Sequence, residues 1–343
     1  MKRTFLLAVV LFALSPQPAQ AIDLFKKKPP TETEKPLVEK TAKTEKKKDA
    51  AVPPKEKPAP FKEFTAAAIG AMQEHVTTSE DTLVELSRNY DIGFVELRAA
   101  NPDVDPWVPG AGVKLVIPTQ YILPDAPRRG IVINLPEMRL YYYGKPETPP
   151  ESYPLGVGRE GLSTPTGSTT VVSKVEGPIW YPTKRMREED PKLPEFMPAG
   201  PDNPLGTHAL YLGWNEYRIH GTNKPFGIGR RSSSGCIRMY PEDIVKLWPE
   251  VPVGTSVTVV NQPVKAAWIG NEFYIEAHPT IEQANAIEEN GGTPGYEMGD
   301  GDMRQILKAA GKDAKLLNWD KIRDIIRTRN GYPVVAATRP EQS

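Results

Sequence analysis

The stretch IHGTNKPFGIGRRSSSGCIRMYPEDI, residues 219–244, contains the single cysteine of the chain, Cys236. Glycines, serines and arginines surround this thiol, and His220 lies sixteen positions before it. Such polar neighbours expose a thiol and favour its thiolate, whereas a structural cysteine is usually buried among apolar residues. An imidazole within hydrogen-bond reach can take the proton of a thiol. The stretch therefore predicts Cys236 as a nucleophile and His220 as its general base.

The start of the chain predicts the compartment in which this chemistry takes place. A basic start, an apolar run over residues 5–14 and small residues at Ala19 and Ala21 are typical of a signal peptide. We expect it over residues 1–21, cleaved after Ala21, which implies an exported, periplasmic protein; an uncleaved anchor is the alternative. In an oxidising compartment, a single cysteine is either reactive or joins two chains.

Composition limits the partners and the number of domains. The 43 basic and 43 acidic residues balance, so charge gives no case for nucleic-acid binding. A chain of 343 residues has room for one domain of ordinary size and a small companion. Residues 22–62 are rich in lysine and proline with few large apolar residues, which predicts a disordered linker. The alternative is a membrane or anionic-polymer patch, but acidic residues interrupt the lysines.

Residues 73–120 predict a small α+β unit. A short strand is followed by Leu83, Leu86 and Tyr90 at helical spacing, a second short helix and a closing strand. This order, with DTL, LSRNY, LRAANP and KLVIP in their places, resembles a LysM module, a small domain that binds N-acetylglucosamine-containing glycans. The loop at Ser79 lacks the glycine that is usual in that family. The resemblance implies glycan binding, and the alternative is a rigid spacer packed on the next domain.

Residues 128–262 predict a mainly β domain, a sandwich or barrel without long helical periodicity. Turn residues separate most of its short alternating runs, and residues 135–138 are typical of a tight hairpin. Residues 263–343 predict a partly helical extension packed on this domain. The alternating runs are residues 131–135, 138–143, 151–157, 169–175, 209–212 and 256–260.

Three separated blocks resemble the L,D-transpeptidase catalytic domain of the YkuD or ErfK type. They are LGVGREGLSTPTGSTTVVSK (155–174), PIWYPTKRMREEDPKLPEFMPAGPDNPLGTHALYLG (178–213) and the stretch at 219–244. The resemblance implies a barrel-like or sandwich-like β fold and acyl transfer through a cysteine thioester. It places Cys236 and His220 on the family's conserved pair. By position, it also implies that the backbone carbonyl of Gly221 orients the imidazole.

The glycine beside Cys236 predicts an oxyanion site. Gly235 has no side chain, so the backbone amides of Ser234, Gly235 and Cys236 can approach a substrate oxygen closely. Many family members have histidine where this chain has Ser234. Because the predicted base is His220, we expect the change to alter substrate contacts more than catalysis.

Four further residues are candidates for substrate binding. Arg238 can pair with a substrate carboxylate, lower the pKa of the thiol, or brace the loop. Trp180 can line a peptide groove or fill the edge of the core, and Tyr211 and Asn223 leave the same choice open. His75, His208 and His278 lie far apart in the sequence and give no zinc spacing, so we expect no metal and no cofactor.

The resemblance and the residues together predict a periplasmic peptidoglycan L,D-transpeptidase. Cys236 attacks the third-residue carbonyl of a tetrapeptide stem and releases the terminal D-alanine. The acyl acceptor stays open: a diaminopimelate amine giving a 3-3 cross-link, the terminal lysine of an outer-membrane lipoprotein, or water, which makes the protein an L,D-carboxypeptidase. A non-catalytic scaffold that binds peptidoglycan is the alternative of another class. We expect stem peptides and glycan strands as partners, with no membrane span after signal cleavage.

Overall fold

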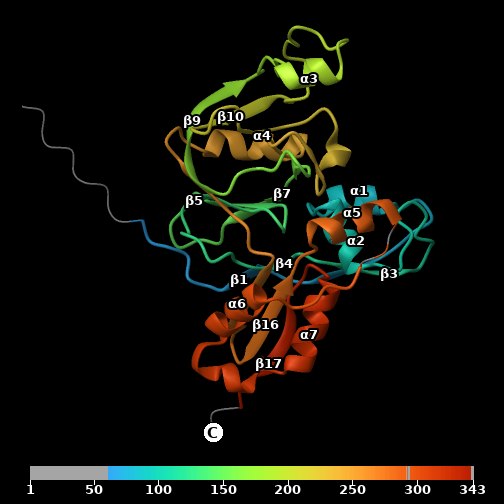
Figure 1. The fold of residues 1–343 in the computed structure, drawn as a ribbon, viewed down its shortest axis with the longest axis vertical. Coiled ribbons are helices and arrows are strands. Elements are labelled where there is room, and N and C mark those ends of the chain that lie inside the picture. The colour runs from blue at the N-terminus through green and yellow to red at the C-terminus, as the bar shows by residue number, and fades with distance from the viewer. Residues whose placement is uncertain (1–60, 291, 293, 341–343) are drawn as a thin grey trace, which may run out of the picture. The chain divides into compact units, whose positions relative to one another are not determined.

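The computed structural model describes residues 61–290, 292 and 294–340. The predicted signal peptide and nearly all of the predicted linker lie outside these described residues. Within them, no helix is both long enough and apolar enough to cross a membrane. Figure 1 shows the described elements with the labels used below.

The segment that resembles a LysM module forms a strand-helix-helix-strand unit. Its two strands pair antiparallel, with Gln73 opposite Ile117. Thr82 starts the first helix, because its side chain accepts a hydrogen bond from the Glu85 amide. This order of elements is the one that the sequence predicts, while glycan binding stays a prediction. The elements are β2 (Gln73–Val76), α1 (Leu83–Asn89), α2 (Phe94–Ala100) and β3 (Lys114–Ile117), flanked by the antiparallel pair β1 (Ala68–Gly70) and β4 (Gln120–Ile122).

The catalytic region is built on one mixed eight-stranded sheet of order β13-β11-β10-β9-β14-β5-β6-β7. Just after β7, Gly156 exchanges two backbone hydrogen bonds with Arg238 of β13, at 2.8 and 2.9 Å, so the two edges of the sheet meet. The prediction of a mainly β, barrel-like domain is therefore confirmed. The strands are β5 (Gly130–Asn134), β6 (Arg139–Tyr143), β7 (Glu151–Pro154), β9 (Gly167–Glu176), β10 (His208–Leu212), β11 (Arg218–His220), β13 (Ile237–Arg238) and β14 (Ser256–Val260), with β8 (Val157–Gly158) and β12 (Arg231–Ser233) as a two-stranded side ribbon.

The expectation that this region lacks longer helices is wrong at α4 (Pro241–Glu250). Proline occupies the first turn of the helix, followed by Glu242 and Asp243, and both features favour a helix start. Ile244 and Leu247 are fully buried on the face that packs against β10. The shorter helices of the region are α3 (Lys184–Glu189) and the 3-10 turn η1 (Pro225–Gly227).

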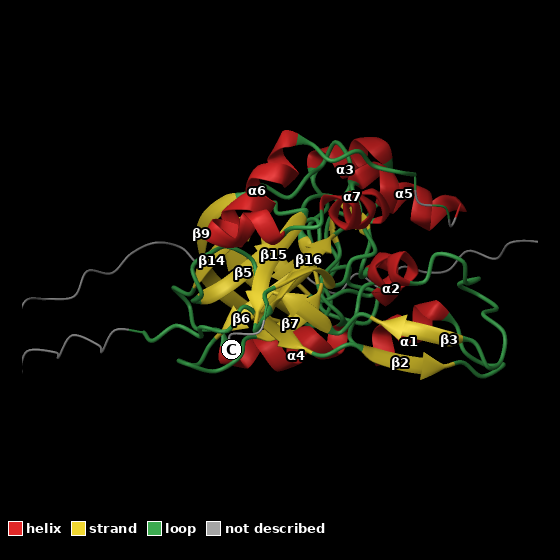
Figure 2. Ribbon diagram, turned by 90° about the horizontal axis from the view of Figure 1, so that it is seen from below, coloured by secondary structure: helices red, strands yellow, loops and turns green. Residues whose placement is uncertain are grey.

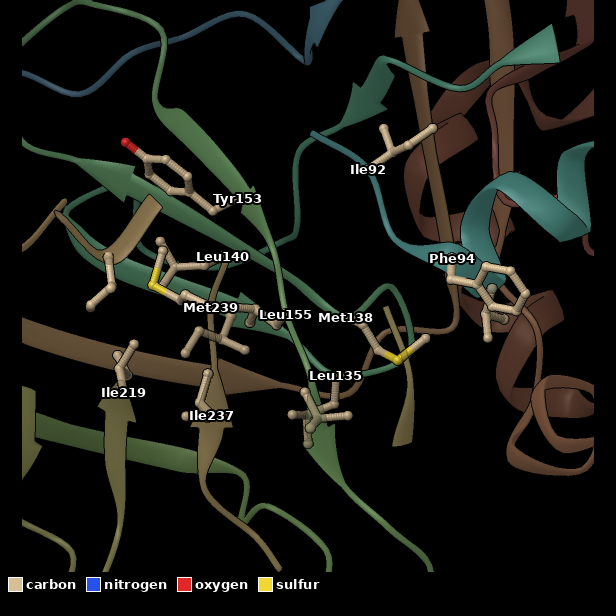
Figure 3. Close-up of a cluster of buried hydrophobic side chains, with 14 of the residues drawn as sticks. Ile92, Phe94, Leu135, Met138, Leu140, Tyr153, Leu155, Ile219, Ile237 and Met239 are labelled. Atoms are coloured by element: carbon tan, nitrogen blue, oxygen red, sulfur yellow. The ribbon is translucent and has the colours of Figure 1, made fainter. Parts of the chain in front are cut away.

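The main core determines which face of the sheet carries the candidate site. Ile219 of β11 and Ile237 of β13 are fully buried, and Figure 3 shows them on adjacent strands, beside Met239 and Leu155. Side chains alternate between the two faces of a strand. The neighbours of these isoleucines along the chain therefore lie on the opposite face, away from α4.

The C-terminal extension forms a small α+β unit with its own core, drawn in orange to red in Figure 1. Phe273, Ile275, Ile306 and Ile322 are fully buried in it. Figure 2 shows the helices α6 and α7 near the strands of this unit. Its elements are β15 (Val264–Ile269), β16 (Glu272–Ala277), α5 (Ile281–Asn290), α6 (Asp300–Ala310), η2 (Gly311–Leu316), α7 (Trp319–Thr328) and β17 (Val334–Thr338), with strand order β15-β16-β17.

The LysM-like unit packs directly on the loop between His220 and Cys236. The Val95 amide donates to the Gly229 carbonyl at 3.2 Å, and the Arg230 guanidinium lies 3.8 Å from the centre of the Phe94 ring. A Cβ atom on Gly229 would lie 2.1 Å from the Phe94 nitrogen, so only glycine fits this contact. The glycine-rich loop at this position is therefore a docking surface for the N-terminal unit.

Candidate active site

The register of three neighbouring strands brings the predicted residues together. Tyr211 of β10 pairs with Arg218 of β11, and His220 of β11 pairs with Arg238 of β13. Cys236 directly precedes β13. Extending the parallel register of β11 and β13 by one residue therefore places Cys236 beside Arg218. These side chains share the face opposite the buried isoleucines. Two rows result, one with Tyr211, Arg218 and Cys236, the other with His220 and Arg238.

His220 is held as a neutral imidazole. Its Nδ1 lies 2.6 Å from the carbonyl oxygen of Gly221, so Nδ1 carries the proton and donates it there. Burial, followed by the charge of Arg238, lowers the pKa of His220 to about 3. The Nε2 lone pair is then free to accept a proton. The Gly221 carbonyl lies where the family resemblance predicts the orienting group.

The Cys236 thiol is half-buried and donates a hydrogen bond to the Glu216 carbonyl at 3.5 Å. Burial raises the pKa of the thiol, although the charges of Arg218 and Arg238 act to lower it. The prediction that its surroundings favour the thiolate is therefore wrong for this state. The sequence shows the polar neighbours but not the desolvation that outweighs them.

No hydrogen bond joins Cys236 to His220 among the described residues. Their backbones are diagonal neighbours, about 8 Å apart between Cα atoms for a strand spacing of about 4.8 Å and a rise of about 3.3 Å per residue. Two side chains of this size can meet across that distance. Proton transfer requires the thiol to turn from the Glu216 carbonyl toward the imidazole, and catalytic hydrogen bonds are often loose without substrate.

The loop before Cys236 is fixed by hydroxyl groups. Ser233 Oγ donates to the Cys236 carbonyl at 2.5 Å and accepts from the Gly235 amide at 3.1 Å. Thr164 Oγ1, in the first of the three blocks, donates to the Gly235 carbonyl at 2.8 Å. Gly235 has a φ of +106°, a conformation that favours glycine.

This loop geometry changes the predicted set of oxyanion donors. The Gly235 amide already donates to Ser233 within the loop, because the positive φ turns it inward. No acceptor within the described part of the chain takes the amide protons of Ser234 or Cys236. These two amides are the donors that remain available to a substrate oxygen.

The second block, residues 178–213, packs against the segment that follows His220. The buried side chain of Asn203 donates to the carbonyls of Pro178 at 2.7 Å and Pro198 at 3.0 Å, which closes the segment onto itself. A Cβ atom on Gly206 would lie 2.7 Å from the Thr222 nitrogen. The PDNPLG motif is therefore packed against the chain that follows His220.

Two of the four predicted substrate contacts lie beside Cys236, and two do not. Tyr211 and Arg238 share its face of the sheet. Asn223 instead donates to the Asp202 carbonyl at 2.7 Å, and Trp180 exchanges backbone hydrogen bonds with Met197 at 2.8 and 2.9 Å. Neither therefore has a contact that links it to the thiol. Among the other histidines, the His208 ring packs against Trp248 at a tilt of 57°, with ring centres 5.0 Å apart.

Two arginines near the thiol were not predicted from the sequence. Arg218 lies beside Cys236, and alternation in a strand ending at His220 is the signal that identifies it. Arg185 of α3 donates to the hydroxyl of Ser234 at 3.0 Å. Ser234 is the position at which the family resemblance predicts a histidine. No local pattern predicts its contact with Arg185, since 49 residues separate the partners.

Three potential metal ligands come together away from the thiol, although their spacing in the sequence gave no such cluster. The ligand atoms of Glu137, Glu276 and His278 lie within 4.8 Å of one another and are buried. The Lys265 ammonium lies 2.8 Å from both carboxylates. It takes the position that a cation would need, so the cluster is best described as a buried ion network.

Comparison with known proteins identifies the family. The model of the L,D-transpeptidase catalytic domain, YkuD, matches residues 128–259. "Probable L,D-transpeptidase YcfS" of Escherichia coli is 38% identical over 294 residues, which cover 83% of this chain and 89% of that protein. "Probable L,D-transpeptidase ErfK/SrfK" of Salmonella typhimurium is 39% identical over 265 residues, 75% of this chain and 84% of that protein. "Probable L,D-transpeptidase YbiS" of Escherichia coli is 47% identical over 203 residues, 57% and 66% of the two chains.

The β domain with a cysteine and a histidine on one face is thus of the transpeptidase class. The chain belongs to the L,D-transpeptidase family. The resemblance of the catalytic domain is confirmed, and family membership supports peptidoglycan stem peptides as the substrate class. The LysM assignment of residues 73–120 stays a prediction.

Proposed function

We propose that this protein is a periplasmic peptidoglycan L,D-transpeptidase that acts through a thioester on Cys236. The observation that supports this most directly is the tautomer of His220. Its Nδ1 proton is directed to the Gly221 carbonyl at 2.6 Å, which leaves Nε2 as an acceptor on the face that carries Cys236. A neutral thiol and a neutral imidazole are the reactants that general-base catalysis requires.

The first half-reaction forms the acyl-enzyme. The thiol leaves the Glu216 carbonyl and gives its proton to Nε2 of His220, while Sγ bonds to the third-residue carbonyl carbon of a tetrapeptide stem. The resulting oxyanion accepts hydrogen bonds from the amides of Ser234 and Cys236. The C–N bond then breaks, His220 returns the proton to the leaving amine, and D-alanine departs. Each oxyanion donor contributes about 3 to 4 kcal/mol to such a step.

The second half-reaction releases the enzyme. An acceptor amine attacks the thioester carbon and loses a proton to His220, the S–C bond breaks, and the thiolate regains that proton. A diaminopimelate amine gives a 3-3 cross-link, a lipoprotein lysine gives an anchored lipoprotein, and water gives carboxypeptidase activity. The described contacts favour none of these acceptors over the others.

One observation favours the other class of function, a peptidoglycan-binding scaffold. In this state the thiol is bonded to Glu216 rather than to His220, and burial raises its pKa. A scaffold does not require a hydrogen bond between Cys236 and His220. The two functions differ in whether Cys236 becomes acylated.

The test is incubation of the purified mature protein with tetrapeptide muropeptides, followed by mass measurement of protein and products. Cys236→Ala is the matched control, and thermal unfolding verifies that it folds. We expect an acyl-enzyme mass, released D-alanine and new amide products, all absent in the variant. Equal retention on peptidoglycan by both proteins, with no adduct and no product, would establish the scaffold instead. Release of D-alanine with water as the sole acceptor would identify a carboxypeptidase.

A further inference from the structure

Two arginines flank the nucleophile without a carboxylate partner among the described residues. The side chain of Arg238 makes no hydrogen bond or ion pair there, and that of Arg218 donates only to the Glu216 backbone carbonyl, at 3.2 Å. The Nε atoms of both are buried without an acceptor. An unpaired cation in a partly desolvated position is costly to the fold, so such a pair is unusual unless a ligand completes it.

Three other arginines show the usual arrangement: the buried Arg139 lies 3.0 Å from a Glu96 oxygen, the buried Arg329 lies 3.3 Å from Asp302, and the partly buried Arg230 lies 2.5 Å from Glu288. Their Nε atoms are also unpaired, so an unpaired Nε by itself is not distinctive. What sets Arg218 and Arg238 apart from these three is the absence of any carboxylate. Arg98 is also buried without a carboxylate partner among the described residues, but it lies in α2, away from the nucleophile.

The geometry places both cations within reach of one substrate group. Arg218 lies beside Cys236 in the strand register, and Arg238 lies two residues after it on the same face. The ring of Tyr211 lies 5.2 Å from the Arg218 guanidinium carbon and supports it from the next strand. Both charges also act on the thiol and on His220. They therefore border the reacting atoms.

We propose that Arg218, together with Arg238, binds the terminal carboxylate of the acyl-donor peptide, and so selects donors in which a single residue follows the attacked carbonyl. This inference rests on the proposed function. In such a donor, three covalent bonds separate the attacked carbon from the carboxyl carbon, within about one residue length of 3.8 Å. A carboxylate that close to Cys236 lies at the Arg218 position. A longer donor carries its carboxylate past the pair.

The planar guanidinium group explains why both positions are arginine rather than lysine. A guanidinium binds a carboxylate with two parallel hydrogen bonds, whereas an ammonium provides a point charge. Binding of the carboxylate also offsets the positive charges that lower the pKa of His220. The correct donor therefore makes the imidazole a better proton acceptor at the time it is needed.

The test compares two donors that differ in one group, a tetrapeptide stem with a free terminal carboxylate and the same stem with a terminal carboxamide. For the wild-type protein we expect kcat/KM for acylation to favour the carboxylate by about 10- to 100-fold, the effect of hydrogen bonds to a charged group. Arg218→Gln is expected to bring the two donors to within a few-fold of each other by slowing only the carboxylate donor. Arg218→Lys should fall between the two proteins.

The matched control is Arg323→Gln, which removes an exposed charge on α7 and should keep the wild-type preference. Equal use of both donors by the wild-type protein would overturn the inference. So would Arg218→Gln slowing both donors by the same factor, because Arg218 would then support the loop or the thiol instead.

A second arm measures donor binding by calorimetry in the Cys236→Ala background, where no acylation occurs. Tighter binding of the carboxylate donor, lost on adding Arg218→Gln, supports the arginine pair independently of turnover. If wild-type protein forms no acyl-enzyme while this preference persists, the proposed function fails and the carboxylate subsite stands. If acylation proceeds without any preference in either arm, the subsite fails and the proposed function stands.

Discussion

Two sites in the described part of the chain bury positive charge and differ in how that charge is neutralised. Between the catalytic sheet and the C-terminal unit, the Lys265 ammonium is 1% exposed and lies 2.8 Å from carboxylates of both Glu137 and Glu276. Beside the nucleophile, Arg218 and Arg238 have no carboxylate within the described ranges. The first arrangement connects two parts of the fold, and the second leaves binding capacity for a ligand.

The difference separates stability from function. In the ion network, burial raises the pKa of Glu137, but Lys265 and His278 outweigh it and lower the pKa, so the carboxylate stays charged with its partners. At the nucleophile, burial lowers the pKa of Arg238; the charge of Cys236 acts in the opposite direction, and no carboxylate of the described residues does. A buried charge that stays unneutralised, in a protein that neutralises buried charge elsewhere, is typical of a binding site.

Loss of the cation from the ion network should have the largest effect on stability. Lys265→Met keeps the length of the side chain but leaves two buried carboxylates without their ammonium. We expect a loss of about 3–5 kcal/mol in the free energy of unfolding. Urea unfolding at neutral pH measures it, with the exposed pair of Lys308 and Asp125 as reference: Lys308→Met should change stability by less than about 0.5 kcal/mol. A loss below about 1 kcal/mol in Lys265→Met would show that the network is not structural.

The pH dependence of stability should reveal the buried neutral imidazole. His220 has a folded pKa of about 3 against about 6.5 when unfolded, so between these values the unfolded chain binds the extra proton. Stability is therefore lost as pH falls from about 6.5 toward 3, by up to about 1.4 kcal/mol per pH unit. When the pH falls from 7.5 to 5, the free energy of unfolding measured with urea should decrease by about 2 kcal/mol less in His220→Gln than in wild type. Parallel losses in both proteins would contradict a buried neutral His220.

Removal of an unneutralised arginine should have the opposite effect on stability to the one expected at Lys265. Arg238→Met keeps the apolar stem and removes a charge that has no partner among the described residues. We expect stability to stay the same or rise by about 1 kcal/mol, while acylation of Cys236 becomes slower. The same unfolding and mass measurements decide it. A loss of more than about 2 kcal/mol would instead favour the role of Arg238 as a brace for the loop.

The sequence predicts the features that depend on local chemistry and on short periodicities. Cys236 and His220 lie in a distinctive stretch, and the alternating runs on either side predict the β domain that the structure confirms. Alternation along β11 places Arg218 on the same face as His220, but its position beside Cys236 depends on the pairing of β11 with β13, a crossover that no local pattern encodes. The raised pKa of Cys236 depends on desolvation by segments distant in the chain. The cluster around Lys265 likewise unites residues 128 positions apart.

The smallest effect is expected where an ion pair is exposed, although both oxygens of its carboxylate are bound. Arg88 of α1 binds both oxygens of Glu242 in α4, at 2.7 and 2.8 Å, and joins the LysM-like unit to the catalytic domain. The two side chains are 41% and 39% exposed, so water competes for both charges and salt screens them. A double-mutant cycle of Arg88→Ala and Glu242→Ala should give a coupling of less than about 1 kcal/mol, reduced further at high salt. A coupling above about 2 kcal/mol would mean that this joint behaves like the buried ion network, and that exposure does not separate the two kinds of charge.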